Sequence, residues 1–280
     1  MTYRDLCARL ADAGIDAAEW DAQLLLEHFL GTDALGLRLS PNQFFQPSEA
    51  LLDAIERRAS RYPLQYIIGE WEFYRQTYEV SPDCLIPRSD TELLVEQAIK
   101  LLPSGARFAD LCTGSGCIAV STLAERSDTS ALAVDKFDST LSIATRNAVR
   151  NGVRDRFDPI CADVLQPDFL PVAEESLDAI LCNPPYIPTD VLKTLEPELS
   201  SEPRAALDGG ADGLIFYETL LKNAARYLKK QGFFLFEIGY DQADALRRLG
   251  VQYGFSGIRI LRDYGGNDRV VHLWRESRIN

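Results

Sequence analysis

Asn183, Pro184, Pro185 and Tyr186 come directly after the apolar segment LDAILC, residues 177–182. Proline lacks a backbone N–H and fixes φ, so the two prolines end a strand and stiffen the loop that follows. The Asn183 side chain then presents one carbonyl acceptor and one NH₂ donor, which suits recognition of a planar amide or amino group. A proline-rich turn in which Asn183 is an Asx cap is the structural alternative.

A glycine-rich segment, DLCTGSGCIA at residues 110–119, lies between a predicted strand and a predicted helix. Gly114 and Gly116 allow the backbone to pass close to a bound nucleoside, and the helix offers free N–H groups. The spacing also fits a dinucleotide site or a tight turn without a ligand. Asp135 ends the next strand 21 residues after Gly114, where a carboxylate accepts hydrogen bonds from ribose hydroxyls. A ribose-bearing cofactor is therefore expected.

Asp163 follows the third predicted strand and falls at the same carboxyl edge of the sheet, where ligands of open α/β folds collect. A helix N-cap or a solvating loop residue would place an aspartate there equally well. The sequence leaves both readings open.

The elements that must position these residues alternate between strand and helix from residue 107 on. Strands are predicted at 107–112, 130–135, 158–163, 177–182 and 233–240, and helices at 117–126, 139–152, 218–231 and 242–250. This order indicates a mostly parallel sheet covered on both faces. Residues 257–276 read as two further strands around a Gly-Gly-Asn-Asp turn, an antiparallel pair at the end of the sheet.

The first seventy residues have a helical pattern. We predict Asp16 as an N-cap and Gly31 as a stop for one helix, and a second helix between Ser48 and Pro63. Short amphipathic helices of this kind pack as a small bundle. Residues 71–87 alternate aromatic and polar residues in two runs, which predicts a β-hairpin between the two parts.

Composition limits the classes of function. The chain has 280 residues, a net charge of −13, six cysteines without a C-x-x-C pair, and only two histidines. The net negative charge repels the phosphate backbone of a nucleic acid and so counts against a nucleic-acid partner. The pattern of cysteines and histidines predicts no metal site. No run of eighteen apolar residues occurs, and no basic segment followed by an apolar one opens the chain, so we expect a cytoplasmic protein with no membrane contact.

Asn183-Pro184-Pro185-Tyr186 together with Gly114-Ser115-Gly116 resembles the class I, S-adenosylmethionine-dependent methyltransferases that modify amide or exocyclic nitrogens. More segments narrow the resemblance to the release-factor glutamine N5-methyltransferase family. These segments are residues 63–69, 85–92, 202–210, 237–239 and 267–270, and the similarity spans nearly the whole chain from Pro63. The family usually has glycine where this chain has Cys112. We expect β geometry at Cys112, in which a side chain is tolerated.

The resemblance implies the fold: a seven-stranded Rossmann-like sheet with an antiparallel final strand and a small N-terminal helical bundle. It implies three parts: a bundle at 1–70 that docks release factors, a hairpin linker at 71–87 and a methyltransferase domain at 88–280. The cofactor would be S-adenosyl-L-methionine, leaving as S-adenosyl-L-homocysteine. The partners would be peptide-chain release factors. The protein would be a monomer that makes no direct contact with nucleic acid.

The resemblance also implies the site residues. Asn183 and the Pro184 carbonyl would accept the two N–H bonds of a substrate glutamine, with Pro185 shaping the loop and Tyr186 closing the pocket or anchoring it in the core. The cofactor would be held at its methionine end by Asp110 and the backbone of Cys112, Thr113, Gly114, Ser115 and Gly116, at its ribose by Asp135, at its adenine by Asp163 and Val164, and beside the methyl group by Asn183.

Some alternatives and one segment stay open. An adenine-N6 nucleic-acid methyltransferase would use the same loop, a dinucleotide oxidoreductase would leave that loop unexplained, and a protein-docking module could carry a degenerate cofactor fold. The case for a nucleophilic role of Cys112 is weak, since methyl transfer needs no covalent intermediate.

For Arg88, Thr91 and Glu92 we expect an ion pair and a helix cap. The long segment 187–212 is expected to form a substrate-side flap.

Overall fold

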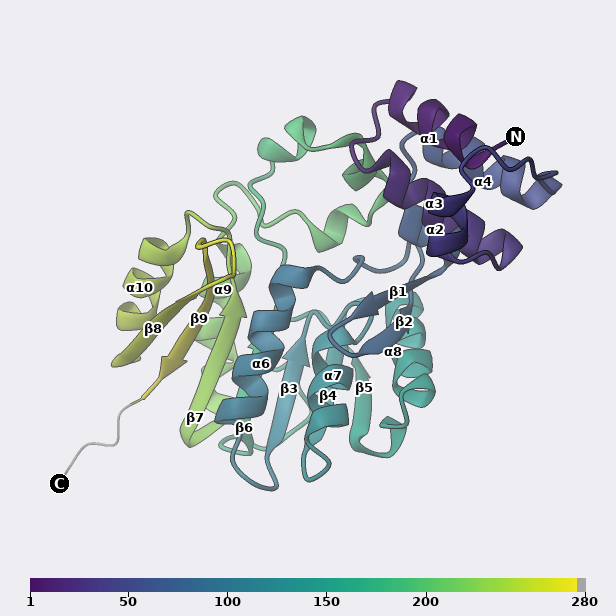
Figure 1. The fold of residues 1–280 in the computed structure, drawn as a ribbon. Coiled ribbons are helices and arrows are strands. Elements are labelled where there is room, and N and C mark those ends of the chain that lie inside the picture. Colours follow the sequence, from purple (N-terminus) through teal and green to yellow (C-terminus); the bar gives the residue numbers. More distant parts are fainter. Residues whose placement is uncertain (276–280) are drawn as a thin grey trace. The chain divides into compact units, whose positions relative to one another are not determined.

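The computed structural model describes residues 1–275, which divide into two compact units (Figure 1). The first unit contains Met1–Glu70 and, from much later in the chain, Glu196–Ser201. The second contains Trp71–Leu195 and the chain from Glu202 on. No helix among the described residues has the length and apolar character needed to cross a membrane.

The first unit is a set of short helices around one apolar core. Its helices are α1 (Tyr3–Asp12), α2 (Ala18–Leu30), α3 (Ala34–Leu39), α4 (Glu49–Ala59) and α5 (Leu64–Ile68). Leu6, Leu10, Leu25, Leu26 and Ile55 are fully buried between them. Gly31 ends α2 in the left-handed region, as predicted, and Ser48 caps α4 by accepting from Leu51 N. The predicted Asp16 cap is wrong, because α2 begins after Ala17 without a side-chain cap.

Glu196–Ser201, the part of the first unit that comes late in the chain, is bound to the region of α4 by ion pairs. Arg58 Nη1 donates to Glu198 Oε1 at 3.0 Å, and Arg61 Nη2 donates to Glu198 Oε2 at 2.8 Å. The Arg58 Nε atom donates to Asp21 Oδ2 at 2.6 Å, so the buried guanidinium is shared by two carboxylates. The middle of the predicted flap is thus part of the helical unit.

The second unit is built on a seven-stranded sheet with the order β5-β4-β3-β6-β7-β9-β8, in which β9 runs antiparallel to both of its neighbours and the rest are parallel. Its strands are β3 (Arg107–Leu111), β4 (Ser130–Asp135), β5 (Phe157–Cys161), β6 (Leu177–Cys182), β7 (Leu228–Glu237), β8 (Gly257–Arg262) and β9 (Asp268–Trp274). The predicted fold class is confirmed. A separate hairpin precedes it, with β1 (Glu70–Phe73) and β2 (Gln76–Glu79).

Helices cover both faces of the sheet, since its central strands are apolar on both sides. Helices α6 (Glu92–Leu101), α7 (Cys117–Glu125) and α8 (Asp138–Arg150) contribute to one core cluster, and α9 (Ile215–Asn223) and α10 (Ala243–Gln252) to the other (Figure 1). One predicted helix ends earlier than expected: the helix predicted at 218–231 ends at Asn223, because β7 already starts at Leu228. Residues 162–176 join β5 to β6 without a helix, as in the predicted order of elements.

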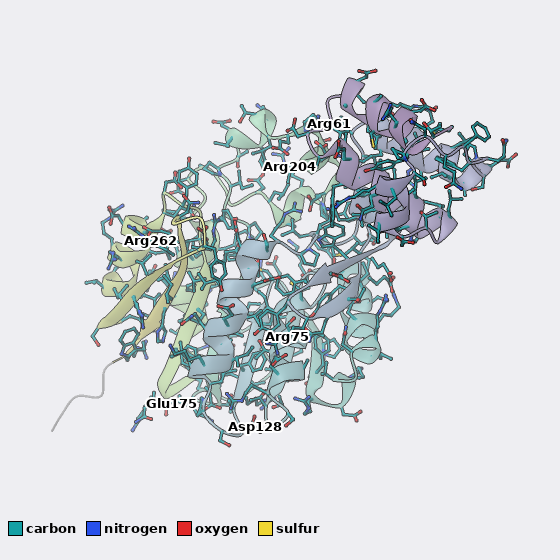
Figure 2. The ribbon with its side chains drawn as sticks, viewed as in Figure 1. Arg61, Arg75, Asp128, Glu175, Arg204 and Arg262 are labelled. Carbon is teal, nitrogen blue, oxygen red and sulfur yellow. The ribbon has the colours of Figure 1, made fainter. Side chains whose placement is uncertain are left out.

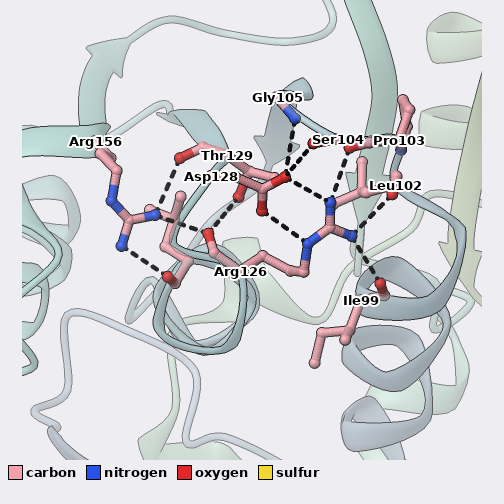
Figure 3. A network of polar contacts seen from close by, with 10 residues as sticks. Ile99, Leu102, Pro103, Ser104, Gly105, Arg126, Asp128, Thr129 and Arg156 are labelled. Carbon is pink, nitrogen blue, oxygen red and sulfur yellow. Dashed lines mark hydrogen bonds and ion pairs between the residues drawn. The ribbon is translucent and has the colours of Figure 1, made fainter.

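The edge of the sheet where the strands begin is closed by a polar network (Figure 3). The Arg126 guanidinium donates to the carbonyls of Ile99 and Leu102 and to Asp128, which in turn accepts from Gly105 N. Arg156 donates to the carbonyl of Arg126. Asp128 and Glu175 lie at this edge, while Arg204 lies toward the edge where the strands end (Figure 2). The site residues gather at that second edge.

Candidate active site

The glycine loop is held closed by Asp110 from inside the sheet. Asp110 is fully buried on β3, and its Oδ2 accepts from Thr113 Oγ1 at 2.6 Å and from Ala119 N at 3.1 Å. Its Oδ1 is buried with no hydrogen-bond partner among residues 1–275. Burial raises the pKa of Asp110 to about 7, against the lowering effect of the bond from Thr113. Asp110 therefore organises the loop and keeps one acceptor unused.

Cys112 does not have the β geometry that we expected. Its φ is 57°, in the left-handed region that favours glycine, and Gly114 and Gly116 follow with φ of 56° and 82°. The backbone therefore turns from β3 to α7 through three left-handed residues. A non-glycine residue there stores about 1 kcal/mol of strain or more. Cys112 is thus a strained substitution at a position whose conformation suits glycine.

Two carboxylates follow the neighbouring strands at the same edge. Asp135 accepts from Gly114 N at 3.0 Å and Phe137 N at 3.2 Å, and its burial raises its pKa although these backbone bonds lower it. Asp163 accepts from Leu165 N at 3.0 Å and pairs with Lys136 at 3.0 Å. These contacts outweigh the effect of burial and lower the pKa of Asp163. No helix starts after Asp163, so it is a loop residue and not an N-cap.

The Asn183 side chain is directed away from its own backbone. Its Nδ2 donates to Thr91 Oγ1 at 3.3 Å, and its Oδ1 makes no hydrogen bond to any residue in the described part of the chain. The Asx-cap reading of Asn183 is therefore wrong. Tyr186, at the other end of the loop, donates its hydroxyl to Glu237 Oε1 at 3.3 Å.

The backbone of this loop is packed against two glycines from the predicted flap and its continuation. A Cβ on Gly209 would lie 2.8 Å from Pro185 O, and one on Gly213 would lie 2.3 Å from Tyr186 O. Gln242 donates to the same Tyr186 carbonyl at 3.0 Å, and Ile187 N donates to Leu207 O at 3.0 Å. The stiffness of the loop thus comes from these contacts as well as from its prolines.

A cavity of about 460 Å³ opens at this edge within the second unit. The predicted site residues that line it are Cys112, Gly114, Asp135, Asp163, Val164, Asn183 and Pro185. The predicted residues outside its lining are Asp110, Thr113, Ser115, Gly116, Pro184 and Tyr186. Of these, Thr113 and Asp110 are bonded to each other at the glycine loop, and Tyr186 is bonded to Glu237.

Sequence reasoning missed several lining residues. They are Asp83, Cys84 and Leu85 before α6, Phe137 and Thr140 at α8, and Pro203, Ala205, Ala206 and Asp208 in the predicted flap. Leu85 and the segment from Pro203 on belong to the motifs that carry the family resemblance, which was the available signal. Their pairing in space was not readable, because more than a hundred residues separate them.

Those motifs bind each other in the structure. Buried Glu202 forms an ion pair with Arg88 and accepts from Ile86 N at 3.1 Å. Thr91 is the residue before α6, but its hydroxyl makes no capping bond and donates instead to Glu237 Oε2 at 2.6 Å. Glu92 accepts from Tyr74 N at 2.9 Å. The expected ion pair of Arg88 exists, while the expected helix cap is wrong.

The site contains no obvious metal centre. Within residues 1–275, no group of three or more His, Cys, Asp or Glu side chains is arranged to hold a metal ion, and none of the six cysteines forms a disulfide. What the cavity offers is a turn of backbone amides, two carboxylates after β4 and β5, and one carboxamide on a stiff loop.

This sheet order, with a glycine loop after the first strand of the fold and Asn-Pro-Pro-Tyr after β6, defines a class I, Rossmann-like methyltransferase. Residues 2–69 match the family model described as the PrmC N-terminal domain, and residues 89–196 match the methyltransferase small domain. The chain is 38% identical over 266 residues to the release factor glutamine methyltransferase of Geobacter sulfurreducens, covering 94% of this chain and 91% of that protein. It belongs to the release factor glutamine methyltransferase family.

Two further comparisons agree. The release factor glutamine methyltransferase of Caulobacter vibrioides is 39% identical over 269 residues, covering 94% of this chain and 91% of that protein. Among solved structures, the hMettl16 catalytic domain in complex with MAT2A 3'UTR hairpin 6 aligns with a TM-score of 0.57 at 14% identity, covering 83% of this chain and 84% of that one. At this identity the likeness concerns the fold alone.

Proposed function

We propose that this methyltransferase transfers a methyl group from S-adenosyl-L-methionine to the side-chain amide nitrogen of a glutamine in peptide-chain release factors, and that Asn183 and the Pro184 carbonyl hold that nitrogen. The observation that carries the proposal is the Asn183 carboxamide, which lines the cavity with Oδ1 unengaged by the described residues and Nδ2 held by Thr91. A site of this kind suits a primary amide, which has two N–H bonds to donate.

The residues in and next to the cavity fit the proposed cofactor. The buried, unpartnered Oδ1 of Asp110 and the amides of the glycine loop suit a charged methionine end, and Asp135 suits a ribose. Phe137, Ala162 and Val164 give an apolar surface for an adenine, with Asp163 beside it. When bound there, the cofactor supplies an electrophilic sulfonium methyl group.

The protein's own task is to make an amide nitrogen react. Its lone pair is delocalised into the carbonyl, so it is a poor nucleophile. Acceptors aligned on both N–H bonds orient the nitrogen and strengthen as positive charge develops on it in the transition state. Orientation of this kind supplies on the order of 7–11 kcal/mol in favourable cases.

The nitrogen loses its proton after transfer, so no dedicated base is required. Asp208 is poorly suited to be one, because Thr189, Arg204 and Gly210 already bind it.

We assign the remaining parts of the chain to partner binding. The helical unit presents large exposed apolar side chains, Trp20, Leu35, Leu39 and Phe44, and we assign it to docking of the release factor. Flap residues 203, 205, 206 and 208 line the cavity, which supports a substrate-side role for the segment. The protein would act as a monomer in the cytoplasm, where release factors work on ribosomes.

The test is transfer of a labelled methyl group from S-adenosyl-L-methionine to a purified release factor. Label is expected on the native factor and not on one in which the acceptor glutamine is replaced. Equal label on both factors would reject the substrate, and label on DNA or RNA instead would favour an adenine-N6 activity. Asn183→Ala should abolish transfer while leaving cofactor binding within a few-fold, and unchanged transfer by this variant would reject the assigned site.

A further inference from the structure

We propose that Thr91 and Glu237 are positioning residues that fix which end of the Asn183 carboxamide faces the cavity. This inference rests on the proposed role of Asn183. Thr91 directly precedes α6 and Glu237 ends β7, 146 positions later, and both are about 1% exposed. Neither residue lines the cavity, so both act through Asn183 and not on the substrate.

The direction of the hydrogen bonds follows from proton counting. A threonine hydroxyl has a single proton to donate and lone pairs with which to accept. The 2.6 Å contact between Thr91 Oγ1 and Glu237 Oε2 takes that proton, because an ionised carboxylate only accepts. Thr91 is then left as an acceptor toward Asn183, so the NH₂ end of the carboxamide must turn to Thr91 at 3.3 Å.

The consequence for the site is that Oδ1 points to the cavity. A carboxamide flipped by 180° would present NH₂ to the substrate amide, donor against donor, and would repel the group that it must hold. The two ends of an asparagine side chain have nearly the same shape, so only hydrogen bonding can select between them. In this protein the selection is made by a buried hydroxyl and a buried carboxylate.

Glu237 also holds the far end of the same loop. Its Oε1 accepts from the Tyr186 hydroxyl at 3.3 Å, and its backbone carbonyl accepts from Tyr217 at 2.8 Å. One carboxylate thus contacts both sides of the Asn-Pro-Pro-Tyr segment, through Thr91 at residue 183 and directly at residue 186. The segments 85–92 and 237–239 thus both contact the Asn-Pro-Pro-Tyr segment, through Thr91 and Glu237.

The test compares Thr91→Val with Thr91→Ser. Valine has the shape of threonine without the hydroxyl, and serine keeps the hydroxyl. We expect Thr91→Val to lower kcat by about 100-fold, the size seen when one preorganised polar contact is lost, with cofactor Kd unchanged. Thr91→Ser should restore kcat to within a few-fold of the native value. Thr122→Val is the control, since Thr122 is buried on α7 with a hydroxyl that has no partner among the described residues.

A second variant keeps the test decisive if Thr91→Val folds poorly. In Glu237→Gln the new amide can donate to Thr91, which frees the hydroxyl to donate to Asn183 and permits the flipped state. Its kcat should fall, and Thr91→Val/Glu237→Gln should be no worse than Thr91→Val alone, because both changes break one chain of bonds. Folded variants with kcat within twofold of native, or a serine variant as weak as the valine variant, would overturn the inference. If instead Asn183→Ala were fully active, the proposed function itself would fail.

Discussion

Gly213 lies against the carbonyl of Tyr186 so closely that a Cβ on it would be 2.3 Å from the Tyr186 oxygen. Its φ is also positive, at 75°. The loop that carries Asn183 therefore packs against position 213, which only glycine can occupy without displacing the loop.

Replacing Gly213 by alanine should displace the Asn-Pro-Pro-Tyr loop and lower kcat more than about tenfold, because sub-ångström orientation controls the rate. The measurement is steady-state methyl transfer with circular dichroism as a check on folding. Gly152→Ala is the matched control: its φ is 70°, but nothing lies within 4 Å of its Cβ position. The control should lose about 1 kcal/mol of stability and no activity. Equal activity losses in both variants would contradict this packing role of Gly213.

Replacing Cys112 by glycine should stabilise the protein by up to about 1 kcal/mol, because relief of left-handed strain exceeds the added entropy of the unfolded chain. The check is the urea-unfolding midpoint of the purified protein. Cys112→Ser keeps both the side-chain size and the strain, so it should give no gain. A glycine variant less stable than the serine variant would show that the packing of the thiol outweighs the strain.

The rate should depend on the ionisation of Glu237. Burial raises its pKa to about 7, although Thr91 and Arg269 lower it. Below that pH the protonated carboxyl can donate to Thr91, and the fixed direction of the hydrogen bonds is lost. We therefore expect kcat at saturating cofactor to fall as the pH drops through about 7. The charged and titratable groups that face Glu237 are Asp90, Cys117, Cys182, Tyr186, Tyr217 and Arg269.

The control for this pH dependence is Glu237→Gln, which has no proton to lose. Its kcat should be low and flat between pH 6 and 8, a range set by the native pKa of about 7. A Gln variant that keeps the acid limb would assign that limb to another group.

Asp110 links the cofactor loop to stability. Its pKa is raised to about 7 by burial, above the ordinary aspartate value, so the folded state binds a proton more tightly than the unfolded state. Its contribution to the free energy of unfolding is therefore full below the ordinary pKa and is lost as the pH rises through about 7. Asp110→Asn keeps an oxygen for Thr113 and Ala119 and should flatten the decline in stability between pH 5 and 8.

The same variant tests the unpartnered Oδ1. If this oxygen binds the cofactor, an NH₂ in its place should weaken binding by about 10- to 100-fold, the value of one bond to a charged group. Isothermal titration with S-adenosyl-L-homocysteine measures it. Unchanged affinity would limit Asp110 to its bonds within the glycine loop.

The alternation of strands and helices was enough to predict the sheet and to place Asp135, Asp163 and Asn183 at one edge of it. This worked because parallel strands bury both faces and end at a common edge. The same local reasoning failed where tertiary contacts decided the outcome. Cys112 adopts a conformation that its residue type disfavours, and the predicted helix at 218–231 ends early because Leu228 pairs with Leu177 in the sheet.

The contacts that position the site residues were harder to predict from the sequence. Thr91 has the residue type and location of a helix cap, and no local pattern shows that its hydroxyl is used 146 positions away. The ion pair of Arg88 with Glu202 has the same character. Such pairings depend on three-dimensional neighbours, which a single sequence does not reveal.

The placement of Glu196–Ser201 in the helical unit has a practical consequence for protein engineering. A chimera that exchanges only the first seventy residues with those of a relative would keep the native Glu198 and remove the native Arg58 and Arg61 that bind it. Exchange of the helical unit between relatives therefore requires two pieces of chain to be transplanted together, and a fragment that starts at residue 71 would leave Glu198 without either arginine.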